Sequence, residues 1–147
     1  PQISCKTLRQ EALVLVASAQ ASPLPERVGF AELAGYPMIL PSVPNALRNL
    51  VDAALQPHRV SLKIIAEVGA MQTMIPLVAK GVACTILPAP AVAAFAPQGT
   101  VQTASIGPPA IHNTLVMATT LTRPANRLTR ATSQLVERLI LEDAYED

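Results

Sequence analysis

The chain has 147 residues, enough for one domain, or for one lobe and part of another. Half of the residues are hydrophobic and only 14% are charged, so the chain can bury a sizeable core. Its formal net charge is +1, whereas a free-standing DNA-binding module carries a strong basic excess that meets the phosphates. Composition therefore argues against this piece binding nucleic acid by itself.

Aromatic residues and cysteines are scarce. Phe and Tyr make up 3% of the chain and Trp is absent, which disfavours base-stacking platforms and aromatic-lined sugar sites. Cys5 and Cys84 form neither a disulfide framework nor a zinc-binding pattern, so a reducing, intracellular setting is the simpler interpretation. No apolar run reaches the roughly 18 residues of a membrane span. The chain begins at Pro1 without the pattern of a signal peptide, and we expect a fragment or a processed product.

Apolar runs rich in Val and Ile alternate with segments of helical period. In chain order we expect a strand at Leu13–Val16, a short helix at Phe30–Gly35, a strand at Pro37–Leu40, a helix at Leu47–Leu55, a strand at Leu62–Val68, a helix from about Thr73 that stops at Gly81, a strand at Ala83–Leu87, a helical turn at Ala89–Phe95, strands at Val101–Ile106 and Thr114–Ala118, and a last helix from about Pro124. This alternation predicts a largely parallel sheet with helices on both faces.

Two stretches of the chain are candidate exposed linkers, Ala19–Glu26 and Leu121–Pro124. They bracket the middle of the chain and predict a compact lobe of roughly residues 19–119. Both ends of that lobe would then continue into a second body.

The loop Ser42–Asn45 lies between an expected strand and an expected helix. Ligands of open α/β sheets bind outside the carboxyl ends of strands, and free amides at a helix N-terminus favour a carboxylate or phosphate. We therefore expect Ser42, Val43 and Asn45 to contact a ligand. The alternative is that Ser42 or Asn45 only caps the helix.

The loop Ala70–Gln72 takes the matching place after the next strand. Pro76 is tolerated only in a first helical turn, so we expect the helix to begin near Thr73 and to leave Ala70, Met71 and Gln72 as loop residues that line the same cleft. The alternative for Met71 is an ordinary core position.

Few other side chains indicate chemistry. Cys84 is expected to be a small buried hydrophobe, and the isolated His58 and His112 are expected to have surface or capping roles rather than to bind a metal. Asp52 and Glu67 are interpreted as solvated or helix-face charges. We find no catalytic constellation and no cofactor motif. The cluster Arg123, Arg127 and Arg130 is interpreted as a solvated face, with an interface as the alternative, and the last helix is expected to fray from about Leu141.

Several motifs together resemble one family. They are F-x-x-L-x-G-Y-P with I-L-P-S at Phe30–Ser42, L-R-N-L-V-D at Leu47–Asp52, V-A-K-G-V-A-C-T-I-L-P at Val78–Pro88 and T-R-P at Thr122–Pro124. In this order they are similar to the effector-binding domain of LysR-type transcriptional regulators. The resemblance implies an α/β, type 2 periplasmic-binding-protein-like, two-lobe Rossmann-like fold whose first lobe is incomplete here. Residues 1–18 would end regulatory lobe I, residues 19–119 would form lobe II, and residues 120–147 would return to lobe I as a strand and the C-terminal helix.

The resemblance also implies a function. The domain would bind a small, anionic metabolite between its lobes and so alter DNA binding by an absent helix-turn-helix domain, without being an enzyme. Expected partners are this effector, further copies in a homodimer or homotetramer, and RNA polymerase for the full-length protein, all in the cytoplasm and without a membrane. Leu47–Leu55 is a candidate for the contact between copies. The alternative interpretation is a periplasmic-type solute-binding protein for uptake.

Overall fold

A computed structural model describes residues 2–121 and 126–142. The chain divides into two compact units. The terminal unit combines Pro1–Glu11 with Thr114–Asp147, and the central unit is Ala12–Asn113. The expected helix start near Pro124 and the expected cation Arg123 lie outside the described residues.

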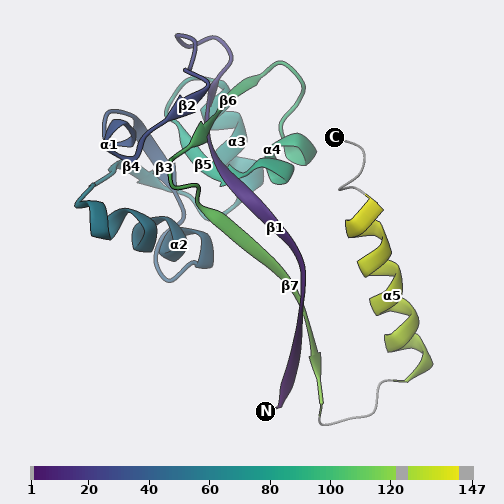
Figure 1. Cartoon of the computed structure of the whole chain (residues 1–147). Helices are drawn as coiled ribbons and strands as arrows, with labels where there is room; N and C mark the ends of the chain where they lie inside the picture. Colours follow the sequence, from purple (N-terminus) through teal and green to yellow (C-terminus); the bar gives the residue numbers. More distant parts are fainter. Residues whose placement is uncertain (1, 122–125, 143–147) are drawn as a thin grey trace. The chain divides into compact units, whose positions relative to one another are not determined.

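Helices and strands alternate along the chain (Figure 1). Their bounds, in order, are β1 (Ile3–Ser18), β2 (Arg27–Val28), α1 (Phe30–Leu33), β3 (Pro37–Leu40), α2 (Ala46–Leu55), the 3-10 turn η1 (Gln56–His58), β4 (Lys63–Glu67), α3 (Met71–Ala79), β5 (Thr85–Pro88), α4 (Ala89–Phe95), β6 (Val101–Ile106), β7 (His112–Thr120) and α5 (Arg127–Glu142). The α/β class expected from the sequence is confirmed.

The direction of the strands differs from the expectation. The main sheet has the order β2-β6-β1-β5, and β1 is antiparallel to both β5 and β6. Among the strand pairs whose register the structure describes, β2–β6 and β3–β4 are parallel, as is a bridge between Met38 and Cys84, and β7 also pairs with β1. The prediction of a largely parallel sheet was therefore wrong. Hydrophobic periodicity reports which face of a strand is buried, and it carries no information on the direction of its neighbours.

Alternating side chains of each central strand enter two hydrophobic clusters. Leu13 and Leu15 of β1 join a cluster with buried residues of α1 and α2, whereas Val16 joins a cluster with Met74 and Val78 of α3. Successive residues of a strand point to opposite faces, so one strand supplies both layers. Helices on both faces of the sheet, as expected, follow from this two-sided core.

The segment that follows β1 is an exposed connection within the central unit. The side chain of Gln102 on β6 fixes it, because Nε2 donates to the carbonyls of Ser18 and Ser22 at 2.9 and 3.1 Å, and Oε1 accepts from the amide of Leu24 at 2.8 Å. Residues Leu13–Ser18 already pair with β5 and β6. The lobe boundaries at 18 and 119 stay a prediction. The division into compact units reports which residues pack together in this chain, and it does not locate a hinge between lobes.

The terminal unit contains part of β1, most of β7 and α5. The amide of Leu121, just after β7, donates to the carbonyl of Gln2 at 2.9 Å, and Lys6 forms an ion pair with Glu137 of α5. Asn126 caps α5, because its Oδ1 accepts from the amide of Thr129 at 2.8 Å.

Candidate functional site

Two loops of the central unit start side by side at one edge of the sheet. The last residues of β3 and β4, Leu40 and Glu67, are register partners in a parallel pair, and the amide of Val68 donates to the carbonyl of Leu40 at 3.0 Å. Both chains then leave the strands for the N-termini of α2 and α3. The loop before α2 is residues 41–45 and the loop before α3 is residues 68–70. We call them the α2 loop and the α3 loop.

The α2 loop carries three of the side chains expected at the site. Ser42 and Val43 are exposed, Val43 to 59%, whereas Asn45 is half-buried. Asn45 is the N-cap of α2, and its Oδ1 accepts from the amides of Leu47 and Arg48 at 2.9 and 3.2 Å. The capping role considered for Asn45 is therefore confirmed. Because Oδ1 already has two donors, only the Asn45 side-chain NH₂ group remains for a ligand.

We predict that Asn45→Ala lowers the free energy of unfolding by about 1 kcal/mol, because two amides at the start of α2 lose their acceptor. Urea denaturation followed by circular dichroism measures this. Asn49→Ala, at an exposed position inside the same helix, is the matched control and should be neutral or slightly stabilising. Equal losses for both variants would contradict the capping role.

The start of α3 differs from the expectation. The helix begins at Met71, with Ala70 as N-cap, and Pro76 lies inside it. Met71 and Gln72 are therefore residues of the first turn, and only Ala70 belongs to the loop. Pro76 is tolerated because Met74, Ile75 and Val78 are buried in one cluster, and this packing outweighs the lost hydrogen bond.

The N-terminus of α3 has no side-chain cap. The carbonyl of Ala70 accepts from the amides of Thr73 and Met74 at 3.0 Å each, as in an ordinary first turn. The amides of Met71 and Gln72 come earlier in the first turn, where a helix offers no carbonyl to accept from them. Exposed amides at a helix N-terminus attract an anion.

Sequence reasoning missed Arg48 on α2. Its Nε donates to Asp52 Oδ2 at 2.9 Å, and its Nη1 donates both to Glu67 Oε1 and to the carbonyl of Pro41 at 3.1 Å. Asp52 and Glu67 are exposed as expected, but each is also ion-paired with Arg48. The spacing of Arg48 and Asp52, four residues apart on one helix, indicated that pair, whereas the contact with Glu67 depends on the tertiary structure.

Beneath the loops, β5 is held to β3 and α3 by a buried hydroxyl. Thr85 Oγ1 donates to the carbonyl of Ile39 at 2.7 Å and also contacts Met74 Sδ at 3.0 Å. The neighbouring Cys84 is only partly buried, and this burial raises the pKa of its thiol. A protonated thiol is a poor nucleophile, which suits the expected role of a small hydrophobe.

The folded state raises the pKa of Cys84. The stability that comes from burying the protonated thiol is therefore fully present below the ordinary thiol pKa, and it is lost as pH rises through the pKa of the folded state.

At pH 8 we predict that a disulfide reagent modifies the exposed Cys5 at least about tenfold faster than Cys84. The two thiols should react in a fast and a slow phase, and the variants Cys5→Ser and Cys84→Ser show which thiol gives which phase. Equal rates in the native protein would contradict the assigned burial.

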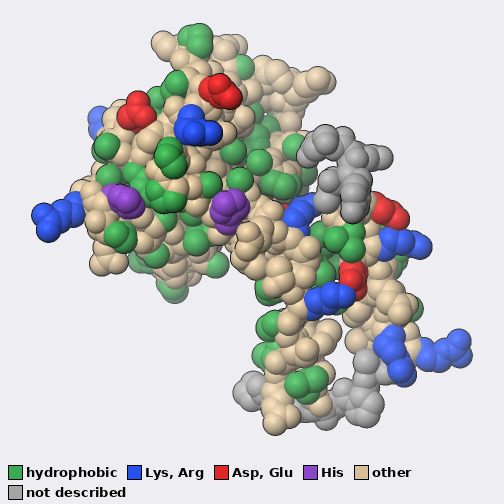
Figure 2. All heavy atoms as spheres, viewed as in Figure 1, with side chains coloured by type: hydrophobic (Ala, Val, Ile, Leu, Met, Phe, Trp, Pro, Cys, Tyr) green, Lys and Arg blue, Asp and Glu red, His purple; other side chains and the backbone are tan. Residues whose placement is uncertain are grey.

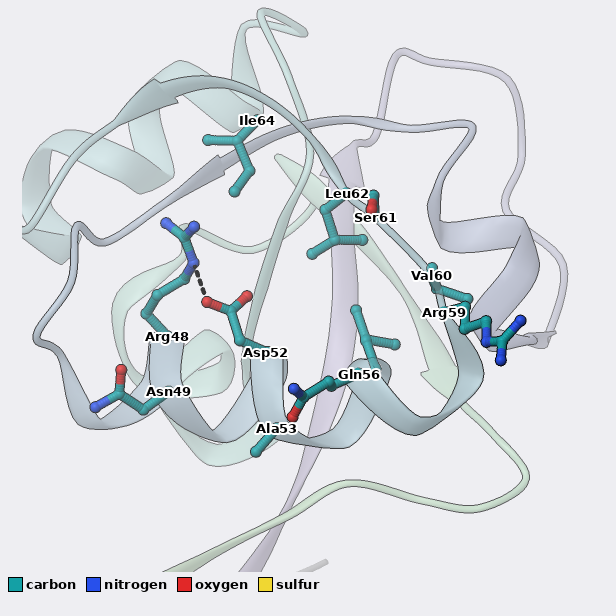
Figure 3. A pocket seen from close by; sticks show the side chains of 11 residues that line it. Arg48, Asn49, Asp52, Ala53, Gln56, Arg59, Val60, Ser61, Leu62 and Ile64 are labelled. Carbon is teal, nitrogen blue, oxygen red and sulfur yellow. Dashed lines mark hydrogen bonds and ion pairs between the residues drawn. The ribbon is translucent and has the colours of Figure 1, made fainter.

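Two hollows border this part of the central unit. One, of about 440 Å³, runs along α3 and is lined by Met71, Gln72, Ile75, Pro76, Ala79, Lys80, Phe95, Pro97 and Thr100. The other, of about 790 Å³, lies between α2 and the segment that leads into β4 (Figure 3). Arg48, Asp52, Gln56 and Arg59 are among its polar lining residues.

The described residues contain no group of three or more His, Cys, Asp or Glu side chains that could hold a metal ion. His58 lies edge-on to Phe30, with ring centroids 4.8 Å apart. On the face of the central unit drawn in Figure 2, positive and negative side chains are few. No helix within residues 2–121 and 126–142 is long and apolar enough to cross a membrane.

Comparison with known proteins gives a family match. A model described as the LysR substrate binding domain matches residues 1–140. YfeR of Shigella flexneri, an uncharacterized HTH-type transcriptional regulator, is 28% identical over 88 residues, which are 59% of this chain and 29% of that protein.

Solved structures are similar over nearly the whole chain. The effector binding domain of QuiR in complex with shikimate has a TM-score of 0.77 at 22% identity, over 95% of this chain and 66% of that one. The regulatory domain of CcmR from Synechocystis PCC6803, in complex with 2-PG, has a TM-score of 0.80 at 14% identity, over 94% and 67%. This chain therefore spans only part of each relative.

Proposed function

Because this chain belongs to the family of LysR substrate-binding domains, we propose that it is the effector-sensing part of a LysR-type transcriptional regulator. The observation that carries the proposal is the meeting of the α2 loop and the α3 loop at one edge of the sheet. Ser42, Val43, Asn45, Ala70, Met71 and Gln72 are the proposed contacts of the effector. The family is one of ligand-binding regulatory domains, which argues against the alternative of a solute-binding protein for uptake.

We infer that the effector is a small organic acid. The described α2 and α3 loops contain no Lys or Arg, and the nearest cation, Arg48, is shared by two carboxylates. The negative charge would therefore be received by the amides of Met71 and Gln72 and by the dipole of α3. Hydroxyl and amide groups of Ser42, Asn45 and Gln72 are available for the rest of the molecule. Shikimate and 2-PG, bound by the similar QuiR and CcmR domains, are compatible with this chemistry.

Regulation would proceed by a shift between conformations. An effector changes such an equilibrium only as far as it binds one conformation more tightly than the other. Contact with DNA is assigned to a helix-turn-helix domain outside this chain, in agreement with the net charge of +1. We place the protein in the cytoplasm, where its operator DNA and RNA polymerase are its further partners.

Helix α2 is the proposed surface for a second copy of the protein in a homodimer or homotetramer. Its inner face, with Val51 and Leu55, is buried in the core, whereas Asn49 and Ala53 line the 790 Å³ hollow and are exposed (Figure 3). Strand β4 beside it pairs with β3 alone among the described strands, so its other edge has free backbone groups. A helix next to a free strand edge is suited to pairing with a copy of itself.

Calorimetry on the full-length regulator tests the site. The panel consists of shikimate, 2-PG, benzoate and the neutral benzamide. We expect binding of at least one anion and none of benzamide. Gln72→Ala and Ser42→Ala should each weaken binding about five- to tenfold, as expected for the loss of one hydrogen bond worth about 1 kcal/mol.

Gln98→Ala, at an exposed position outside both loops, is the matched control and should leave affinity unchanged. Anion binding that is insensitive to both loop substitutions would show that the site is elsewhere. Binding of benzamide as tight as that of benzoate would contradict the role of the α3 amides.

A further inference from the structure

Arg48 contacts the α2 loop and the end of the strand that leads into the α3 loop. It belongs to the first turn of α2, yet its Nη1 group donates to the carbonyl of Pro41 in the α2 loop and to Glu67 at the end of β4, each at 3.1 Å. Glu67 directly precedes the α3 loop. One side chain therefore joins the two segments that lead to the candidate contact residues.

The contacts of Arg48 fix its orientation. Its side chain is only 14% exposed, and Asp52 on the next turn of α2 holds Nε at 2.9 Å. Figure 3 shows the guanidinium group between α2 and the strand that carries Ile64. The planar guanidinium group of Arg has five N–H donors and can donate to a carbonyl and two carboxylates at once. The ammonium group of Lys, on a flexible stem, cannot reproduce this geometry.

The strand end that Arg48 contacts has little other support. Strand β4 pairs only with β3 within the described chain, and their register shifts between Met38 and Ile39. The side chains of β4 are exposed apart from the half-buried Ile64. Beyond Glu67, the hydrogen bond from Val68 to Leu40 closes the pair. Strand ends of this kind open locally at low free-energy cost unless other contacts hold them.

We propose that Arg48 is a positioning residue that fixes the spacing of the α2 loop and the α3 loop through Pro41 and Glu67. The proposal deepens the effector site described above and rests on it for its functional meaning. Arg48 does not itself contact the effector. It determines whether the amides at the start of α3 and the side chains of the α2 loop are presented together, which sets the affinity for a small ligand that touches both.

Hydrogen exchange of the full-length regulator without ligand tests the geometry. In Arg48→Gln we expect the amide of Val68 to exchange about five- to tenfold faster than in the wild type, because the end of β4 is released. The amide of Ile39 donates to Cys84 on the other side of β3, and its exchange should stay unchanged. Unchanged exchange at Val68, or an equal increase at both amides, would overturn the proposal.

Conservative variants separate positioning from general stability. Arg48→Lys keeps the charge, and the amide of Val68 should then exchange faster than in the wild type but more slowly than in Arg48→Gln. Glu67→Gln weakens the contact with β4 and should raise exchange at Val68 about threefold. Asp52→Asn leaves the contacts of Arg48 with Pro41 and Glu67 in place, and exchange at Val68 should stay within about twofold of the wild type. Equal effects of Asp52→Asn and Glu67→Gln would assign Arg48 to the surface of α2 alone and would overturn the proposal.

The affinity for whichever of shikimate, 2-PG and benzoate binds the wild type most tightly, measured by calorimetry, provides the functional readout. We expect Arg48→Gln to weaken binding about tenfold with a melting temperature close to that of Asp52→Asn. If wild-type protein binds no member of the anion panel, the proposed function fails, while hydrogen exchange at Val68 still decides the role of Arg48. If wild-type protein binds an anion of the panel and Arg48→Gln binds that anion equally well, the positioning role is wrong and the proposed function stands.

Discussion

Leu15→Ala is expected to lower the free energy of unfolding by about 3–5 kcal/mol, the largest effect we predict for a single substitution. Leu15 lies in β1, is fully buried, and has Ile86 of β5 and Ala104 of β6 as register partners on its two sides. Truncation removes a large apolar side chain at the centre of the sheet. The neighbouring strands are tied by backbone hydrogen bonds and cannot close the cavity.

Chemical denaturation followed by far-ultraviolet circular dichroism measures this loss, because the sequence contains no Trp that could serve as a fluorescent probe. Leu128→Ala on α5 is the matched control, because Leu128 is 75% exposed. It should change the free energy of unfolding by less than about 0.5 kcal/mol. A loss below about 1 kcal/mol for Leu15→Ala would contradict the assigned core.

Gly107→Ala is expected to cost about 2–4 kcal/mol. Gly107 follows β6, has a φ of +129°, and donates its amide to the carbonyl of Val28 at 2.9 Å. A Cβ atom at this position would lie 2.8 Å from the backbone carbonyl atoms of Pro109. Backbone atoms cannot move aside as a flexible side chain can, so the connection between β6 and β7 would have to shift.

Two other glycines provide a graded control for this prediction. Gly99 also has a positive φ, of +75°, but a Cβ atom there meets nothing within 4 Å, so Gly99→Ala should cost only about 1 kcal/mol of backbone strain. Gly69 has neither feature, and Gly69→Ala should be neutral or stabilising by up to about 1 kcal/mol. The order of the three losses, measured by denaturation, is the test. Similar losses at Gly107 and Gly99 would show that the contact with Pro109 is absent.

Much of the local structure could be predicted from the residues. Pro37–Leu40 and Val101–Ile106 are strands, and Ala89–Phe95 a helix, with the bounds expected from their apolar runs and flanking residues. Asn45 caps α2 because an amide side chain before an amphipathic helix satisfies its first amides wherever the helix packs. These features depend on neighbours a few positions apart, which the sequence displays directly.

The start of α3 shows where local rules failed. Pro76 indicated a helix that begins near Thr73, yet the helix begins at Met71. Burial of Met74 and Val78 against β1 and β3 stabilises the additional turn more than the missing amide of Pro76 destabilises it. A competition between a local penalty and a tertiary gain cannot be decided from spacing alone.

The sequence by itself determined the α/β class, the alternation of elements, the family resemblance and the position of the loop before α2. Only the tertiary structure decided that β1 runs antiparallel to β5 and β6 and that Arg48 joins the α2 loop to the end of β4. The physical reason is the distance along the chain over which each interaction acts. Hydrophobic period and capping act within one or two turns of chain, whereas strand direction and the pairing of Arg48 with Glu67, 19 positions away, depend on how distant segments meet.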